Sequence, residues 1–268
     1  MHSTDNLFAT VFDTLIVEQR EGGVVLVMLN RPQAHNAYNA KMVAELVHIV
    51  EKVEQTPAIR VVILTGAGER TFCAGADLHE ALINGGEGLR NRHGGFNPLH
   101  LMPRRKVWIA ALNGHAYGGG FEMALHCDLI IAESGVSLSL PETRHSLLPV
   151  GGGISQLAKL LPAPLIKELI FTAAPLTARR AASLGVINQV VERAELLPAA
   201  INLAARINRS APLAVQAANA LIDRAIHGDP QDFTTAVEIE LSKLQQSDDI
   251  KESAQAFQQK RLPEWKGC

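Results

Sequence analysis

Cysteine is scarce in this sequence: Cys73, Cys127 and Cys268 are far apart and form no Cys-x-x-Cys pair. A disulfide framework needs an even and denser set of cysteines, and a zinc knuckle needs closely spaced pairs, so both are excluded. The histidines are equally scattered and show no metal-ligand spacing. We therefore expect no metal site and interpret the histidines as surface or core residues.

Strong charge and long apolar runs are also missing. The net charge of −2 gives no basic field to attract nucleic acid or an anionic membrane. No run of about 18 uncharged apolar residues is available to span a bilayer. The opening segment, MHSTDNLFAT, lacks the basic region and apolar core of a secretory signal. We expect a cytoplasmic protein with no nucleic-acid or membrane partner.

Alternating strand and helix patterns fill most of the chain. Short apolar runs at 61–66, 107–114 and 128–132 predict buried strands, and LIVEQREGGVVLVMLNRP predicts two more around Gly22-Gly23. Helical spacing over 39–55, whose first residue suits an N-cap, predicts a helix between them. This alternation is typical of an α/β protein with a largely parallel sheet. From about residue 195 the pattern is all-helical, over 195–209, 212–227, 231–246 and 249–259.

Three glycines mark the end of an expected strand in GHAYGGGFEMALHCD, residues 114–128. Gly118, Gly119 and Gly120 let the backbone take positive φ and approach a ligand closely. The first amides of a helix have no internal partner and lie at the positive end of its dipole, which suits a phosphate or an oxyanion. The same glycines also fit a tight turn that serves packing alone.

A second segment, TGAGERTFCAGADLHEA, repeats this arrangement after the expected strand at 61–66. If both helix starts face one space, the backbone amides of Ala76 and Gly119 can donate to the same carbonyl oxygen and form an oxyanion hole. The polar, glycine-rich stretch at 84–98 predicts a mobile loop over such a site.

Two carboxylates accompany the glycines. Glu122 lies among apolar residues near a helix start, and Glu142 follows a proline. Taken singly, Glu122 also fits a residue stabilised by the helix dipole, and Glu142 fits a surface turn residue or a partner for Arg144. As a pair beside an oxyanion hole, they predict acid–base catalysis on a carbonyl compound.

A series of motifs resembles the crotonase (enoyl-CoA hydratase/isomerase) superfamily along essentially the full chain. They are LNRPQAHNAYN (29–39), FCAGADL (72–78), AALNGHAYGGGFEMALHCDLIIA (110–132), LPETRHSLLPVGGG (140–153), AASLGVINQVV (181–191) and AFQQKRLPEWKG (256–267). The resemblance implies an α/β fold, with a crotonase-like spiral of ββα units over residues 1–200. It implies a C-terminal helical oligomerisation region over residues 201–268, and a homotrimer or homohexamer.

The resemblance further implies an acyl-CoA thioester substrate and no separate cofactor, because CoA is part of the substrate. It assigns the oxyanion hole to the amides of Ala76 and Gly119. In hydratases of the family two glutamates, here Glu122 and Glu142, hold the water that adds across the α,β double bond. The resemblance places substrate or CoA contacts at Ala74, Asp77, Leu78, Gly118, Val150 and Lys260.

Some positions depart from the family pattern. Lysine is frequent where Gln33 and His79 stand, so we expect the CoA phosphates to be contacted differently. Glycine is frequent at Ser146 and Val150, and we expect the valine side chain to narrow the pocket. Lys260 matches a family lysine that reaches the CoA of a neighbouring subunit, but it also fits a solvated helix end.

Within the superfamily, two stretches resemble the carnitinyl-CoA dehydratase branch: NGHAYGGGFEMAL and KRLPEWKG. The substrates of that branch have acyl groups that carry a quaternary ammonium. A pocket for that group needs aromatic faces or a carboxylate, and Phe96, Trp108 and Tyr117 are available. We expect an enoyl-CoA hydratase. The alternatives are an isomerase, a carnitinyl-CoA dehydratase-type lyase on the same scaffold, or a non-catalytic binding protein.

Overall fold

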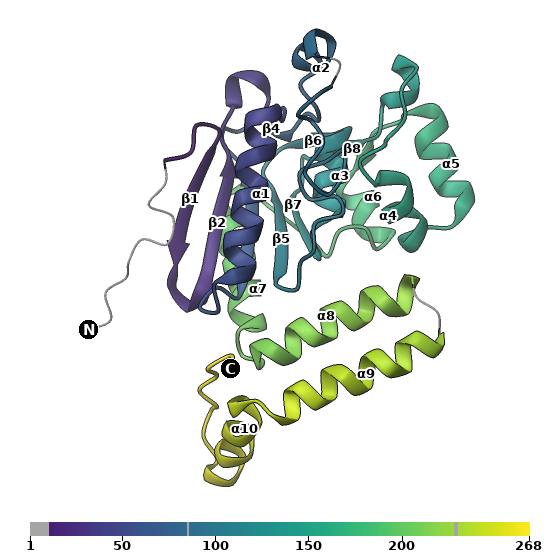
Figure 1. The fold of residues 1–268 in the computed structure, drawn as a ribbon. Helices are drawn as coiled ribbons and strands as arrows, with labels where there is room; N and C mark the ends of the chain where they lie inside the picture. Colours follow the sequence, from purple (N-terminus) through teal and green to yellow (C-terminus); the bar gives the residue numbers. More distant parts are fainter. Residues whose placement is uncertain (1–10, 85, 228–229) are drawn as a thin grey trace.

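The computed structural model describes residues 11–84, 86–227 and 230–268, and its larger sheet has six strands in the order β1-β2-β3-β5-β7-β10 (Figure 1). The strands are β1 (Leu15–Arg20), β2 (Val24–Leu29), β3 (Val61–Gly66), β5 (Val107–Leu112), β7 (Leu129–Glu133) and β10 (Gln189–Val191). β1 pairs antiparallel with β2, and every other pair is parallel. The predicted hairpin and the three predicted buried strands are confirmed.

A smaller sheet of four strands has the order β4-β6-β8-β9. These strands are β4 (Thr71–Cys73), β6 (His115–Tyr117), β8 (Ser137–Ser139) and β9 (Leu176–Thr177). β4, β6 and β8 are parallel, so their carboxyl ends lie at one edge of the sheet. That edge is where the two glycine segments meet.

The chain winds repeatedly from the large sheet to the small sheet and then into a helix. β3 and β4 lead to α2 (Leu78–Asn84), and β5 and β6 lead to α3 (Gly119–Leu125). This repeat is the predicted spiral of ββα units. The remaining helices before residue 195 are α1 (Ala40–Gln55), α4 (Gly153–Leu160), α5 (Ala163–Thr172) and α6 (Ala178–Ser183), with short 3-10 turns at η1 (Glu21–Gly23), η2 (Pro32–Ala34), η3 (Glu142–His145) and η4 (Arg193–Glu195).

Apolar side chains cover both faces of the large sheet. Successive residues of a strand point to opposite faces, so Val25 and Val27 of β2 enter the core that contains α1 and α3, whereas Val24 and Leu26 enter the core under α7. This double burial explains why the strands are continuous apolar runs without polar alternation. α1 begins as predicted: the Asn39 side chain accepts from the Met42 amide at 3.0 Å.

Four helices complete the chain: α7 (Leu196–Ile207), α8 (Pro212–His227), α9 (Pro230–Gln245) and α10 (Asp248–Gln259). Their bounds agree with the prediction. α7 packs on the large sheet through Leu196, Ala200 and Ala204, so the boundary predicted at residue 200 falls inside a helix that belongs to the core. The division into two domains stays a prediction.

α9 and α10 lie below the sheets in Figure 1, whereas α8 packs against the core of the large sheet through Val215. Arg105, next to β5, forms an ion pair with Glu240 of α9 at 2.6 Å, and Arg60 donates to the Trp265 carbonyl at 2.6 Å. α8, α9 and α10 expose large apolar side chains, among them Ile222, Ile226, Ile239, Leu241 and Phe257. No helix in the described ranges is long and apolar enough to cross a membrane.

Candidate active site

The first site segment connects β4 to α2. Tyr38 forms an isolated parallel bridge with Ala76: the Tyr38 amide donates to the Gly75 carbonyl, and the Asp77 amide donates to the Tyr38 carbonyl, each at 2.9 Å. Because alternate amides of an extended segment point to opposite sides, the Ala76 N–H faces away from Tyr38. Within the described part of the chain it has no hydrogen-bond acceptor. It is therefore available to a ligand.

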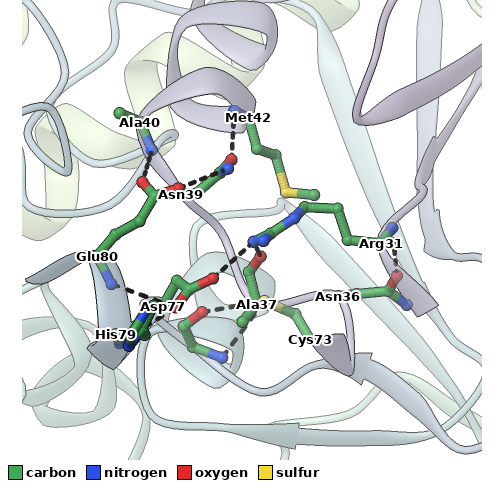
Figure 2. Close-up of polar contacts among 11 residues, drawn as sticks. Arg31, Asn36, Ala37, Asn39, Ala40, Met42, Cys73, Asp77, His79 and Glu80 are labelled. Atoms are coloured by element: carbon green, nitrogen blue, oxygen red, sulfur yellow. Dashed lines mark hydrogen bonds and ion pairs between the residues drawn. The ribbon is translucent and has the colours of Figure 1, made fainter. Parts of the chain in front are cut away.

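Charged side chains hold this segment against the start of α1 (Figure 2). Arg31 donates to Asp77 Oδ2 at 3.0 Å and to the Ala37 carbonyl at 2.7 Å. Glu80 accepts from Asn39 Nδ2 at 2.9 Å. Burial raises the pKa of Asp77, but the Arg31 bond and two amides at the start of α2 outweigh it, so the pKa is lowered. The Asp77 carboxylate thus has a structural task, and its substrate contact stays a prediction.

The second site segment connects β6 to α3 through Gly118, whose φ is 53° and whose amide donates to the Ser139 carbonyl at 2.9 Å. Gly119 is the first residue of α3, so its N–H has no partner within the helix. A Cβ added to Gly75 would lie 3.1 Å from the Gly119 nitrogen. The two segments therefore touch, and the oxyanion hole formed by the amides of Ala76 and Gly119 stays a prediction.

The packing explanation of the glycines is supported by the structure, and the approach to a ligand stays a prediction. A Cβ on Gly119 would lie 2.8 Å from Tyr38 Cε1, and a Cβ on Gly120 would lie 2.8 Å from Cys73 Cβ. These distances are too short for side-chain carbon, so close packing requires glycine at both positions. The close packing is also what brings the start of α3 against the end of β4.

Glu122 lies one turn into α3 and is only 3% exposed. Its Oε1 accepts from the Gly153 amide at 2.8 Å. Burial raises the pKa of Glu122 to about 7; the Gly153 and Gly151 amides act against this rise, and the charge of Glu142 adds to it. A carboxyl group with such a pKa can both accept and release a proton near neutral pH.

Glu142 begins η3 and is half-buried. A Cβ on Gly118 would lie 3.1 Å from Glu142 Oε1, so this carboxyl group faces the glycine segment. Burial raises its pKa. Its Oε2 is buried and has no partner among the described residues. Arg144, the partner considered from the sequence, instead donates to the Thr172 carbonyl at 2.8 Å, so that alternative is wrong.

The two glutamates belong to different elements and face different glycines: Glu142 Oε1 lies against Gly118, whereas the Glu122 carboxyl group lies against Gly151 and Gly153. Burial under Gly119 raises the pKa of Tyr38, and the charges of the two glutamates add to this rise. Two carboxyl groups with raised pKa values, next to two free backbone amides, can move protons at a carbon skeleton while the amides hold a carbonyl oxygen.

Sequence reasoning missed two residues that support the site, Tyr38 and Asn97. Tyr38 donates its hydroxyl to the Phe96 carbonyl at 3.2 Å. Asn97 is 0% exposed and donates to the Gly119 carbonyl at 2.7 Å. The end of the predicted loop at 84–98 is therefore packed onto α3. Its composition predicted a loop, but nothing in it marked which polar residue is buried.

The three aromatic residues proposed for a cationic acyl group are placed differently. Trp108 is 0% exposed inside the core and cannot face a ligand. The Arg90 guanidinium covers the Phe96 ring at 3.6 Å from its centroid. Tyr117 lines a cleft of about 490 Å³ that also includes Ala74. The structure therefore removes Trp108 from that hypothesis.

The other predicted contacts divide into two groups. Ala74, Leu78 and Val150 have exposed side chains near the glycine segments; Val150 precedes Gly151, and a Cβ on Gly151 would lie 2.5 Å from Glu122 Oε2. Lys260 is the C-cap residue of α10. All four contacts stay predictions.

Two further chemistries fit the site poorly. Burial raises the pKa of the Cys73 thiol to about 12, so this cysteine is a neutral packing group at physiological pH and a poor nucleophile. Among the residues that the structure describes, no cluster of three or more His, Cys, Asp or Glu side chains is arranged to hold a metal ion.

Comparison with known proteins supports the resemblance over nearly the whole chain. The family profile described as enoyl-CoA hydratase/isomerase matches residues 19–268. A carnitinyl-CoA dehydratase of Proteus mirabilis is 39% identical, covering 92% of this chain and 96% of the relative, and one from Escherichia coli is 36% identical, covering 92% and 97%.

The fold agrees as well. The crystal structure of an enoyl-CoA hydratase from Mycobacterium marinum superposes with a TM-score of 0.87 at 34% identity, covering 95% of this chain and all of that one. The motifs, the spiral fold and the relatives, including those of the carnitinyl-CoA dehydratase branch, lead to one assignment. This chain belongs to the enoyl-CoA hydratase/isomerase family of the crotonase superfamily.

Proposed function

We propose that this enzyme catalyses the reversible addition of water to the α,β double bond of an enoyl-CoA thioester. Family membership makes the chain a lyase-type enzyme, and an acyl-CoA thioester substrate is consistent with it. The observation that supports hydration best is the pair Glu122 and Glu142, two carboxyl groups with raised pKa values near the start of α3, where the Gly119 amide has no partner within the helix.

The geometry suggests how the residues divide the reaction. The thioester oxygen lies between the amides of Ala76 and Gly119, which stabilise the enolate that forms as charge moves onto that oxygen. One glutamate accepts a proton from the water whose oxygen bonds to Cβ. The other, Glu142 by resemblance to the family, gives a proton to Cα. The net change is one hydroxyl on Cβ and one hydrogen on Cα.

Further predicted contacts complete this proposal. Ala74, Leu78 and Gly118 border the opening to the two amides, and Val150 narrows it near Glu122. The exposed apolar residues of α8, α9 and α10 suit an interface between copies, which supports a homotrimer or homohexamer in which Lys260 reaches the CoA of a neighbour. We retain the cytoplasm as the predicted location.

The experiment is a spectrophotometric assay that follows loss of the conjugated-thioester absorbance. The panel runs from crotonyl-CoA to longer enoyl-CoAs, with Glu122→Gln and Glu142→Gln as variants. Hydration by the wild type and its loss in both variants supports the proposal. Binding of CoA thioesters without hydration, together with double-bond migration that takes up no oxygen from labelled water, would identify an isomerase instead.

A second candidate is dehydration of a carnitinyl-CoA-type substrate, favoured by the relatives of that name at 39% and 36% identity. Because Trp108 is buried and Arg90 covers Phe96, the acyl ammonium would have to rely on a carboxylate or on Tyr117. Adding crotonobetainyl-CoA to the panel separates the candidates: a rate well above that of crotonyl-CoA favours the dehydratase-type activity.

A further inference from the structure

His126 ends α3 one helical turn after Glu122, and its amide donates to the Glu122 carbonyl at 3.1 Å. Residues four apart lie on the same helix face, so both side chains meet the segment Gly151–Gly153. A Cβ on Gly152 would lie 2.5 Å from His126 Nε2, and a Cβ on Gly153 would lie 3.0 Å from Glu122 Oε1. The glycines are therefore required by the close approach of these two side chains.

The hydrogen bonds of the His126 ring define its state. Nε2 lies 2.7 Å from the Gly151 carbonyl oxygen, which can only accept. Nδ1 lies 3.1 Å from Gln156 Nε2, which can only donate. The ring is therefore neutral, with its proton on Nε2.

The charges around the ring favour the same neutral state. Burial lowers the pKa of His126 to about 3; the bond to Gly151 opposes this, and Arg104, His100 and Lys159 lower it further. His100 stacks on the ring with centroids 5.1 Å apart, and Arg104 donates to the His126 carbonyl. The ring keeps its proton arrangement across the physiological range and acts as a fixed donor.

We propose that His126 is a positioning residue. Its Nε2–H donates to the Gly151 carbonyl and fixes the segment Gly151–Gly153. This segment in turn presents its amides to the Glu122 carboxylate. The charge of Glu142 on η3 disfavours the negative charge of Glu122, and Tyr38, in the segment before α1, is neutral because burial raises its pKa. The inference rests on the proposed function for the catalytic task of Glu122, but the contact it describes can be measured without turnover.

The test compares the wild type with His126→Phe, His126→Gln and a matched control, His100→Phe. The control keeps an aromatic ring stacked on His126 and does not touch the Gly151 bond. Glutamate labelled with ¹³C at Cδ, with Glu122→Gln for assignment, gives the pKa of Glu122 by NMR titration. Rates over a pH range then give kcat and KM for hydration.

His126→Phe removes the Nε2–H donor to Gly151. The amides of Gly151–Gly153 then stabilise the Glu122 carboxylate less well, so the pKa of Glu122 rises. We expect the Glu122 titration and the acid limb of kcat/KM to move up by about one pH unit, with kcat about tenfold lower and KM nearly unchanged. His126→Gln supplies an N–H at a similar reach and restores both. His100→Phe changes neither.

An unchanged Glu122 pKa in His126→Phe overturns the proposal, as does a folded His126→Gln variant that behaves like His126→Phe. If His126→Phe does not fold, Gln156→Met replaces it as the test. This variant removes the hydrogen-bond partner of His126 Nδ1 and must raise the Glu122 pKa. An unchanged Glu122 pKa in Gln156→Met would also overturn the proposal. If the wild type hydrates no enoyl-CoA while its Glu122 pKa still responds to His126, the proposed function fails and the positioning inference stands.

Discussion

The two glycine segments have the same backbone plan but are stabilised in different ways. Each leaves a short strand of the small sheet and enters a helix, and each offers one free amide, at Ala76 and at Gly119. The first is held against the start of α1 by paired carboxylates: Asp77 accepts from Arg31, and Glu80 accepts from Asn39. The second is buried among apolar side chains and contains one carboxyl group, Glu122, which has no cationic partner among the residues that the structure describes.

This difference shows how one turn geometry serves two tasks. A carboxylate with a cationic partner keeps a low pKa and holds structure, as the lowered pKa of Asp77 indicates. A carboxyl group with only backbone donors in an apolar setting has a pKa near neutrality, as burial raises that of Glu122 to about 7. The segment that is harder to stabilise therefore contains the group suited to proton transfer.

The largest expected effect comes from removing the acid of the buried segment. Glu122→Gln should reduce kcat for hydration by about a thousandfold, because the amide cannot exchange a proton, while folding and CoA binding persist. Stopped assays and circular dichroism check this. The exposed Glu168→Gln on α5 is the control and should have wild-type rates. Full activity in Glu122→Gln would show that the buried segment has no catalytic acid.

The stability of the protein should depend on pH through the same group. Below the unfolded pKa both states are protonated, and between about 4.5 and 7 the unfolded state ionises while folded Glu122 does not. Stability therefore falls over this window, by up to about 3 kcal/mol. In thermal melts from pH 4 to 8, Glu122→Gln should lose this fall and become more stable than the wild type at the upper end. Parallel curves would mean that Glu122 titrates normally.

Adding one methyl group at Gly119 should lower the free energy of unfolding by about 2 kcal/mol. The Cβ of Gly119→Ala would overlap the Tyr38 ring, which displaces either the ring or the amide, so hydration falls as well. Gly94→Ala is the control: residue 94 has a positive φ, but an added Cβ would have no atom within 4 Å. Its loss of stability therefore measures backbone strain without steric overlap. Urea titrations measure both, and equal losses would show that close packing at Gly119 is unimportant.

The smallest effect on activity and stability is expected in the segment between β4 and α2, which contains Asp77. Asp77→Asn keeps an acceptor for the α2 amides but loses the charge that pairs with Arg31, whose side chain is 17% exposed. We expect a loss of about 1 kcal/mol in unfolding free energy and a kcat within about threefold of the wild type. A thousandfold loss of kcat would instead assign Asp77 to the reaction and remove the contrast between the segments.

Much of the fold follows from local patterns. The strands of the large sheet are buried on both faces, so each is a short apolar run that stands out in the sequence, and the Asn39 cap is a local interaction. The motifs also predicted the two amides and the two glutamates as site residues, and these roles stay predictions; the structure places Glu142 against Gly118 and Glu122 against Gly151–Gly153. The loop at 84–98 was less predictable, because burial of Asn97 depends on a partner far along the chain, the Gly119 carbonyl.

The sequence by itself determined five strands of the large sheet, α1, the four C-terminal helices and the family, because periodicity, capping and motifs are local properties of the chain; the short strands of the small sheet did not stand out in it. Only the tertiary structure decided that Asp77 pairs with Arg31, that Trp108 is closed to ligands, and that Gly151–Gly153 lies between Glu122 and His126. These outcomes depend on desolvation and on contacts between residues distant in sequence, and both exist only once the spiral has closed.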